Sequence, residues 1–194
     1  MKIKLFAILL LFVLSCNEKY TPKPRGYFRI DFPKKEYHKI PKKFPYQFDI
    51  AGYSKIARDT RNPDKPYWIN VEIPANKAEI HLSYYNLNSS SKPEKFLLAE
   101  FMEESRTLAY KHSIKASSIR ERIYMNPEKN VYGTIYDIAG NAASPMQFFL
   151  TDSTNHFLRG ALYIRATPNI DSLKPVIEFL ETDVVRLIET ANWN

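Results

Sequence analysis

Cysteine and glycine are scarce in this chain, and each shortage excludes a class of site. Cys16 is the only cysteine among 194 residues, so the chain can form no internal disulfide and no cysteine cluster for a metal ion. Its five glycines are scattered and build no glycine-rich loop of the kind that cradles phosphate groups. The sequence also lacks the Gly-x-Ser-x-Gly turn that presents many serine nucleophiles.

Histidine is equally sparse, and no histidine has a second potential metal ligand at the usual spacing. The four histidines are His38, His81, His112 and His156. We interpret His81, on a predicted strand, as an ordinary surface or edge residue. We therefore expect no metal, no cofactor and no enzymatic activity.

The one long apolar run is short for a membrane span. Residues 5–14 are all apolar, about ten residues against the roughly twenty that a transmembrane helix needs. Lys2 and Lys4 precede the run, and Ser15 and Cys16 follow it. A basic start, a short apolar core and a small residue before the break are typical of a secretory signal peptide.

The end of this segment resembles the bacterial lipobox, in which the cysteine thiol receives a diacylglycerol and becomes the first residue after cleavage. An ordinary signal peptide with an incidental cysteine is the alternative. Because the lone thiol lies at the cleavage position, we favour lipidation of Cys16 and a signal peptide over residues 1–15. Each buried methylene of an acyl chain contributes about 0.8 kcal/mol, so two or more chains would hold the protein firmly on a bilayer.

Positive charge is concentrated after this segment. Residues 17–66 hold 13 Lys and Arg against 6 Asp and Glu, whereas residues 67–194 hold 13 against 15. A basic stretch beside a membrane is attracted to anionic headgroups. Nucleic acid is the usual rival partner for such charge, but an exported lipoprotein rarely meets it, and we expect no nucleic-acid binding.

Residues 16–45 form a basic arm that is rich in proline and aromatic residues. The prolines argue against a helix or a central strand, and the aromatic side chains present too much apolar area for a plain tether. Either the arm packs along the body as an extended strap, or it docks another protein, and the two are compatible. The candidate docking residues are Tyr20, Arg25, Tyr27, Phe28, Arg29, Phe32, Lys34 and Lys35.

Residues 46–194 have the pattern of one α+β domain. Alternating apolar and polar residues predict strands at 46–50, 67–73, 78–85, 118–125, 131–138, 146–151 and 156–165, and residues 54–58 are expected to pair back on the first. Helical spacing predicts two long helices at about 93–112 and 171–191. In the second, we expect Asp171, Glu178, Glu181, Asp183 and Glu189 to face water. The sum is a mainly antiparallel sheet of about six strands packed with two helices.

The segment from Tyr20 to Ile30, with its Pro-Lys-Pro-Arg-Gly-Tyr-Phe-Arg core, resembles the gliding motility lipoproteins of the GldD type, and Phe44 to Phe48 continues the likeness. This resemblance implies a non-catalytic structural or assembly component of the gliding machinery, linked to type IX protein secretion. It implies as partners the bilayer, through Cys16, and other envelope proteins, and it carries over only Cys16 as a functional residue. The order of elements also resembles the PsbP-like α/β/α sandwich.

The sequence favours a body that faces the periplasm, because no acidic run follows Cys16. An envelope lipoprotein that binds a small ligand or a peptidoglycan fragment is the alternative function. In that case we expect Tyr84, Tyr136 and Tyr163 to line a cleft on one face of the sheet.

Overall fold

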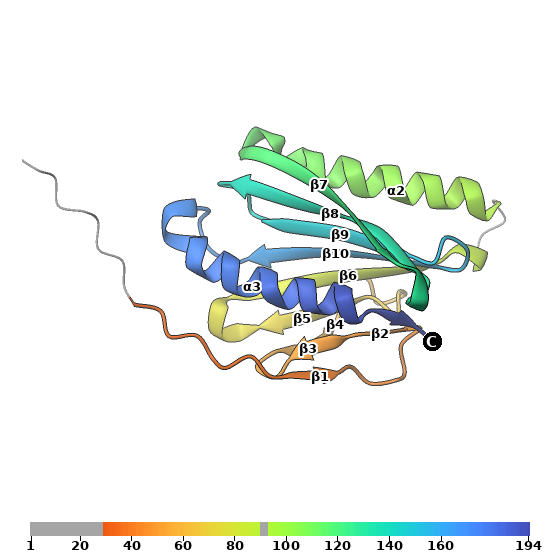
Figure 1. Cartoon of the computed structure of the whole chain (residues 1–194), viewed down its shortest axis with the longest axis horizontal. Helices are drawn as coiled ribbons and strands as arrows, with labels where there is room; N and C mark the ends of the chain where they lie inside the picture. The colour runs from red at the N-terminus through yellow and green to blue at the C-terminus, as the bar shows by residue number, and fades with distance from the viewer. Residues whose placement is uncertain (1–28, 90–92) are drawn as a thin grey trace, which may run out of the picture. The chain divides into compact units, whose positions relative to one another are not determined.

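A seven-stranded antiparallel sheet is the centre of the computed structural model, which describes residues 29–89 and 93–194 (Figure 1). The spatial order of the strands is β4-β5-β6-β10-β9-β8-β7. Their bounds are β4 (Lys55–Arg58), β5 (Ile69–Ile73), β6 (Ala78–Asn86), β7 (Ala116–Asn126), β8 (Val131–Gly140), β9 (Met146–Thr151) and β10 (His156–Ile164). All six pairings are antiparallel, so the predicted sheet type is confirmed.

Short turns fix the register of the hairpins. The 3₁₀ turns η1 (Pro74–Asn76) and η4 (Pro127–Lys129) join β5 to β6 and β7 to β8, and each ends on a residue in the left-handed region, Lys77 with φ 49° and Asn130 with φ 52°. A proline at the start fixes φ for the turn, and a left-handed residue at its end returns the chain to the sheet. The remaining short turns are η2 (Leu87–Ser89) and η3 (Lys111–Ile114).

Two helices cover opposite faces of the sheet (Figure 1). Helix α3 (Ile170–Thr190) buries residues such as Leu180 and Leu187 against one side, which we call the α3 face. Helix α2 (Glu94–Tyr110) packs Leu97 and Ala109 on the other side, the α2 face. Both helices lie within about two residues of their predicted bounds, and the α+β class with an antiparallel sheet between two helices is confirmed.

The segment predicted as one strand over 46–50 is divided into two. Strand β2 (Tyr46–Gln47) pairs with β11 (Asn192–Trp193), whereas β3 (Asp49–Ala51) pairs with β1 (Tyr37–Lys39). The prediction that residues 54–58 pair back on this segment is wrong, because β4 pairs with β5 instead. The alternation correctly reported that Tyr46, Phe48 and Ile50 point into the core, but it could not report which segments supply the hydrogen bonds.

Residues 31–45, which we call the strap, belong to the same compact unit as residues 46–194. Ile40 and Phe44 of the strap are buried in the cluster on the α3 face. Strand β1 gives this segment backbone hydrogen bonds to β3, and the Ile40 N–H donates to the Phe48 carbonyl at 3.1 Å. The strap therefore packs along the body, as the first alternative for the arm predicts for these residues.

Candidate functional site

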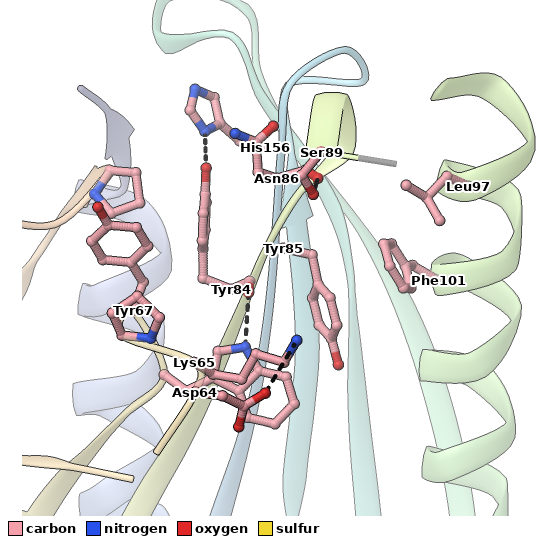
Figure 2. Close-up of a pocket in the computed structure, with 13 residues that line it drawn as sticks. Asp64, Lys65, Tyr67, Tyr84, Tyr85, Asn86, Ser89, Leu97, Phe101 and His156 are labelled. Carbon is pink, nitrogen blue, oxygen red and sulfur yellow. Dashed lines mark hydrogen bonds and ion pairs between the residues drawn. The ribbon is translucent and has the colours of Figure 1, made fainter. Parts of the chain in front are cut away.

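A cleft of about 620 Å³, which we call the aromatic cleft, opens where the end of β6 meets the loop before β5 and the first turns of α2. Six rings contribute to its walls: Tyr67, Trp68, Tyr84, Tyr85, Phe101 and His156. All of these except Trp68 are labelled in Figure 2. Tyr84 and Tyr85 are neighbours on β6, so their side chains leave the strand on opposite sides and the cleft extends around its end. Concave sites of this size with mostly apolar walls are the usual form of small-ligand pockets.

Contacts among the rings hold these walls in place. The Tyr84 hydroxyl lies 2.7 Å from His156 Nδ1, and the Trp68 indole N–H donates to the Tyr84 carbonyl at 2.8 Å (Figure 2). Trp68 meets Tyr85 edge to face at 5.3 Å between ring centroids, and Tyr85 lies 4.3 Å from Phe101. Because the Tyr84 hydroxyl and the Trp68 indole N–H are engaged in these bonds, these two side chains offer mainly their ring faces and edges to a ligand.

The walls of the cleft are uncharged near neutral pH. Burial, reinforced by the charge of Asp152, raises the pKa of Tyr84 to about 12. Burial lowers the pKa of His156, although Asp152 acts in the opposite direction. Charge is confined to Asp64 and Lys65, which pair at 3.7 Å (Figure 2). An uncharged ligand with flat apolar faces fits this chemistry better than an ion does.

The three tyrosines predicted to share one cleft do not lie together. Tyr84 lines the aromatic cleft and also joins the cluster on the α3 face. Tyr136 is buried under α2, on the other face of the sheet. Tyr163 lies beside His81, with 5.2 Å between their ring centroids. Strand alternation was assigned within each strand, but no pattern in the sequence related the faces of separate strands.

The histidine that lines the cleft is His156, at the start of β10, and not His81. His81 Nε2 lies 3.0 Å from Oε1 of the buried Glu79, and Glu79 also pairs with Arg165, so His81 belongs to a separate polar group. His156 follows the tight Asp152–Asn155 turn, in which Asp152 accepts the His156 backbone N–H at 2.8 Å. That turn was recognisable in the sequence, but its position near Tyr84 depends on the pairing of β6 with β10.

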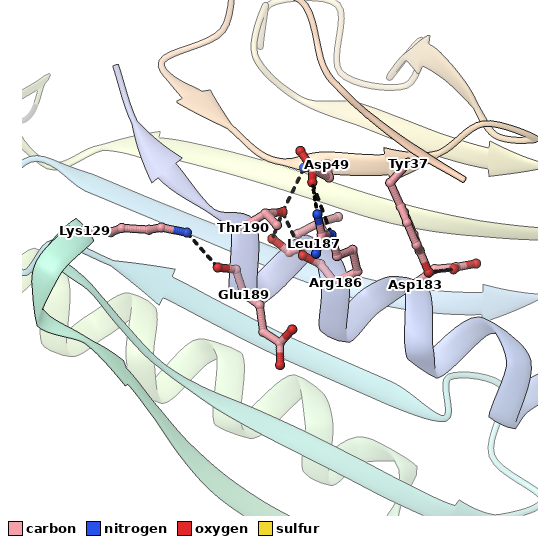
Figure 3. A network of polar contacts seen from close by, with 8 residues as sticks. All are labelled: Tyr37, Asp49, Lys129, Asp183, Arg186, Leu187, Glu189 and Thr190. Atoms are coloured by element: carbon pink, nitrogen blue, oxygen red, sulfur yellow. Dashed lines mark hydrogen bonds and ion pairs between the residues drawn. The ribbon is translucent and has the colours of Figure 1, made fainter. Parts of the chain in front are cut away.

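A buried carboxylate fastens the strap to helix α3. Asp183 is 5% exposed and accepts hydrogen bonds from Lys35 Nζ at 2.6 Å and from the Tyr53 hydroxyl. It also accepts one from the Tyr37 hydroxyl at 2.9 Å (Figure 3). Burial and then the bond to Asp183 raise the pKa of both tyrosines, so they stay protonated donors. The prediction that Asp183 faces water is wrong, because three donors from two distant segments satisfy it in the interior.

Aromatic packing completes this contact, which we call the clamp. Phe32 of the strap stacks on Phe179 of α3, with 4.3 Å between the centroids and 14° between the planes. Lys35 Nζ lies 3.8 Å from the centroid of the same ring and donates to the Phe179 carbonyl at 2.7 Å. Nearby, Arg186 donates to Asp49 at 2.7 Å, which ties β3 to the same helix (Figure 3).

The clamp divides the residues that were predicted to dock a partner. Phe32 and Lys35 are engaged with α3, whereas Lys34 is exposed and pairs with Glu36, two positions along the strap, at 3.2 Å. Arg29 is exposed at the start of the described chain. The other predicted positions lie outside the described residues, namely Cys16, Tyr20, Arg25, Tyr27 and Phe28.

Within residues 29–89 and 93–194, no group of three or more His, Cys, Asp or Glu side chains is arranged to hold a metal ion. In the same part of the chain, neither α2 nor α3 is apolar enough over a sufficient length to cross a bilayer.

Comparison with known proteins identifies a family for this chain. The chain matches no curated protein. Among solved structures, it is similar to the solution structure of cyanobacterial PsbP (CyanoP) from Synechocystis sp. PCC 6803, with a TM-score of 0.48 and 8% identity, over 84% of this chain and 95% of that one. The family model described as gliding motility lipoprotein GldD matches residues 17–193, which is nearly the whole chain. The chain therefore belongs to the gliding motility lipoprotein GldD family.

Proposed function

We propose that this protein is a lipid-anchored, non-catalytic structural component that helps to assemble the gliding motility machinery and the type IX secretion apparatus linked with it. The observation that carries the proposal is the family match, which includes the arm and the body together. In this proposal, residues 1–15 are removed, Cys16 carries the acyl chains, and the body faces the periplasm.

The clamp supports an assembly role because it joins the arm to the body mechanically. Lys35 and Tyr37 are bonded to a carboxylate that is about 150 positions away in the sequence. A partner bound to the arm would thus act on the whole domain, not on a loose tether. We assign partner binding to the predicted arm positions other than Phe32 and Lys35, which are engaged with α3. These are Tyr20, Arg25, Tyr27, Phe28, Arg29 and Lys34.

The test is a crosslinking pull-down of the lipidated protein from its own membranes, with captured proteins identified by mass spectrometry. We expect the intact chain to capture gliding and secretion envelope proteins, and a variant lacking residues 20–28 to lose them. That deletion spares the strap, so the melting temperature of the variant should match that of the intact chain. Equal capture by both forms would overturn the assignment of the arm as the partner-binding surface.

The aromatic cleft favours a second candidate function, binding of a peptidoglycan fragment. Sugar rings present flat C–H faces that stack on aromatic side chains, and Asn86 and Ser89 at the cleft supply polar groups for hydroxyls. Titration calorimetry with a soluble N-acetylglucosamine–N-acetylmuramic acid disaccharide tests it. We expect binding that Tyr67→Ala weakens, because Tyr67 is 41% exposed at the cleft and can be shortened without opening the core. No heat of binding to the intact protein would remove this candidate.

A further inference from the structure

A second, smaller cleft, which we call the basic cleft, lies between the strap and the edge of the sheet. Its volume is about 310 Å³, and its walls carry two cations, Lys43 of the strap and Arg58 of β4. Apolar side chains form the rest of the surface, including Phe44, Ile56 and Ile69. Tyr67 stands between this basic cleft and the aromatic cleft, and lines both.

Neither cation of the basic cleft is neutralised by a carboxylate of the described residues. Arg58 donates from Nη2 to the Pro63 carbonyl at 2.7 Å, and Lys43 Nζ lies 5.3 Å from the centroid of the Phe44 ring. By contrast, several arginines elsewhere in the described residues are paired with carboxylates: Arg120 and Arg122 with Asp137, Arg165 with Glu79, and Arg186 with Asp49.

The carboxylates nearest in sequence are committed to other groups. Asp59 accepts the Arg61 backbone N–H at 3.0 Å and the Asn62 side-chain amide at 2.7 Å. Burial acts to raise the pKa of Asp59, but these hydrogen bonds hold it below its usual range, so the anion is stabilised within its own loop. Asp64 pairs with Lys65. The positive charge of the basic cleft is thus left for an external anion.

We propose that the basic cleft binds the phosphate of an anionic lipid headgroup at the membrane that carries the anchor. Arg58 supplies a planar fork of donors and Lys43 a point charge, which are the two usual partners of phosphate. The apolar floor fits the glycerol and ester region next to the phosphate, which a free inorganic ion would not use. Tyr67, partly exposed at the rim, is of the residue type enriched at membrane interfaces.

The surface around the basic cleft also carries positively charged side chains. Further cations are exposed on the strap and around β4, which a bilayer with anionic lipids would attract. They are Lys34, Lys39, Lys42, Lys55, Arg61 and Lys65. An acyl anchor holds a protein at one point and leaves its orientation open. A second contact through the basic cleft would turn the strap and β4 toward the bilayer.

This inference rests on the proposed membrane anchoring, and its test removes the anchor so that the two can fail separately. We would use the mature chain with Cys16→Ala, which cannot be acylated, in co-sedimentation with vesicles. One set contains phosphatidylcholine alone and the other also contains phosphatidylglycerol. We expect binding to the second set only, and about a tenfold or greater loss of affinity in the Lys43→Gln/Arg58→Gln variant.

Two matched variants separate a defined site from diffuse attraction. Lys95→Gln/Lys115→Gln removes the same charge from exposed positions outside the strap and β4, and should leave binding unchanged. Lys39→Gln/Lys42→Gln removes it from the strap but outside the cleft, and should weaken binding less than the cleft variant does. Arg58→Lys keeps the charge but loses the planar fork of donors. Its affinity for the vesicles should therefore lie between that of the intact protein and that of the cleft variant. Since all these side chains are on the surface, melting temperatures should agree within about 2 °C.

Several outcomes would overturn the proposal. Equal losses in the cleft variant and the Lys39/Lys42 variant would mean general surface charge without a headgroup site. Displacement by inorganic phosphate, beyond the effect of chloride at the same ionic strength, would mean a site for free phosphate. Equal binding to an acidic peptide such as poly-glutamate would mean a protein partner. Retained capture of envelope proteins by the lipidated chain would, in each case, leave the proposed function standing.

Discussion

The two faces of the sheet are covered very differently. Among the described residues, the α3 face holds a cluster of 26 buried apolar residues, which includes the strap residues Ile40 and Phe44, whereas the α2 face holds eight. Large apolar side chains stay exposed on α2 and on β7 beyond it. They include Phe96 of α2, Ile114 of the following turn, and Ile123 and Met125 of β7.

This difference indicates that the α3 face contributes most of the stability, whereas the α2 face leaves room for binding. Burial of apolar area contributes about 25 cal/mol per Å², so the free energy of unfolding depends mainly on the α3 face. The α2 face is covered less completely, and one end of α2 forms a wall of the aromatic cleft. Four pairs of variants test how the α3 face is held and how it differs from the α2 face, in order of decreasing expected effect.

The largest effect is expected from shortening a leucine of α3. Leu180 is fully buried, so Leu180→Ala should lower the free energy of unfolding by about 3–5 kcal/mol, through lost burial and the cavity left behind. The matched change on the other face, Leu97→Ala in α2, should cost about 1–3 kcal/mol, because Leu97 lies at the open cleft and its surroundings can relax. Urea denaturation measures both. A larger loss from Leu97→Ala would reverse the comparison.

Removing the carboxylate of the clamp should be the next most damaging change. Asp183→Ala leaves Lys35, Tyr37 and Tyr53 without their common acceptor, and a buried unpaired donor is costly, so we expect a loss of about 2–4 kcal/mol. Limited proteolysis should also cut the strap faster than in the intact protein. Asp171→Ala, an exposed change at the start of the same helix, is the control and should stay within about 0.5 kcal/mol. A stable Asp183→Ala variant would show that aromatic packing alone holds the strap.

Neighbouring lysines of the strap provide a sharper version of this test. Lys35→Glu would place a second carboxylate against Asp183, and we expect a loss of about 2 kcal/mol. Lys34→Glu changes the same charge on an exposed side chain and should alter stability by less than about 0.5 kcal/mol. Thermal unfolding compares the two. Equal effects would mean that the contact of Lys35 with Asp183 contributes nothing to stability.

The sequence predicted the local elements well and the long-range contacts poorly, for a physical reason. Alternation and helical spacing are local properties, and they located both helices and the hairpin of β5 with β6. The pairing of β2 with β11 joins Tyr46 to Trp193, and no local pattern reports such a partner. The clamp was missed for the same reason: Lys35 resembled any other arm lysine, and Asp183 resembled any other helix carboxylate. The aromatic cleft likewise combines segments that are far apart in the sequence around the end of β6.

Two carboxylates on α3 show how position decides the role of a charge. The smallest stability change that we predict concerns one of them, Glu181. Asp183 has three donors, but Glu181, also predicted to face water, is half-buried near Asp137. Burial, then the charges of Asp137 and Glu178, raise the pKa of Glu181, while Arg122 and Arg120 act in the opposite direction. A raised pKa means that the folded state binds the proton more tightly than the unfolded state does. Stability should therefore fall as the pH rises from the unfolded pKa, near 4.5, through the raised folded value.

The variant Glu181→Gln removes this titration and keeps the shape of the side chain. We expect it to be as stable as the intact protein at low pH and slightly more stable near neutral pH, by no more than about 0.5 kcal/mol because solvent screens a half-exposed group. Urea denaturation at a series of pH values measures the difference. Glu189→Gln, an exposed change further along the same helix, is the control and should change the stability little at any of these pH values. If Glu181→Gln instead destabilised the protein at neutral pH, its ionised carboxylate would be making a favourable contact with Arg122, and the rim of the α3 face would be held by charge as the clamp is.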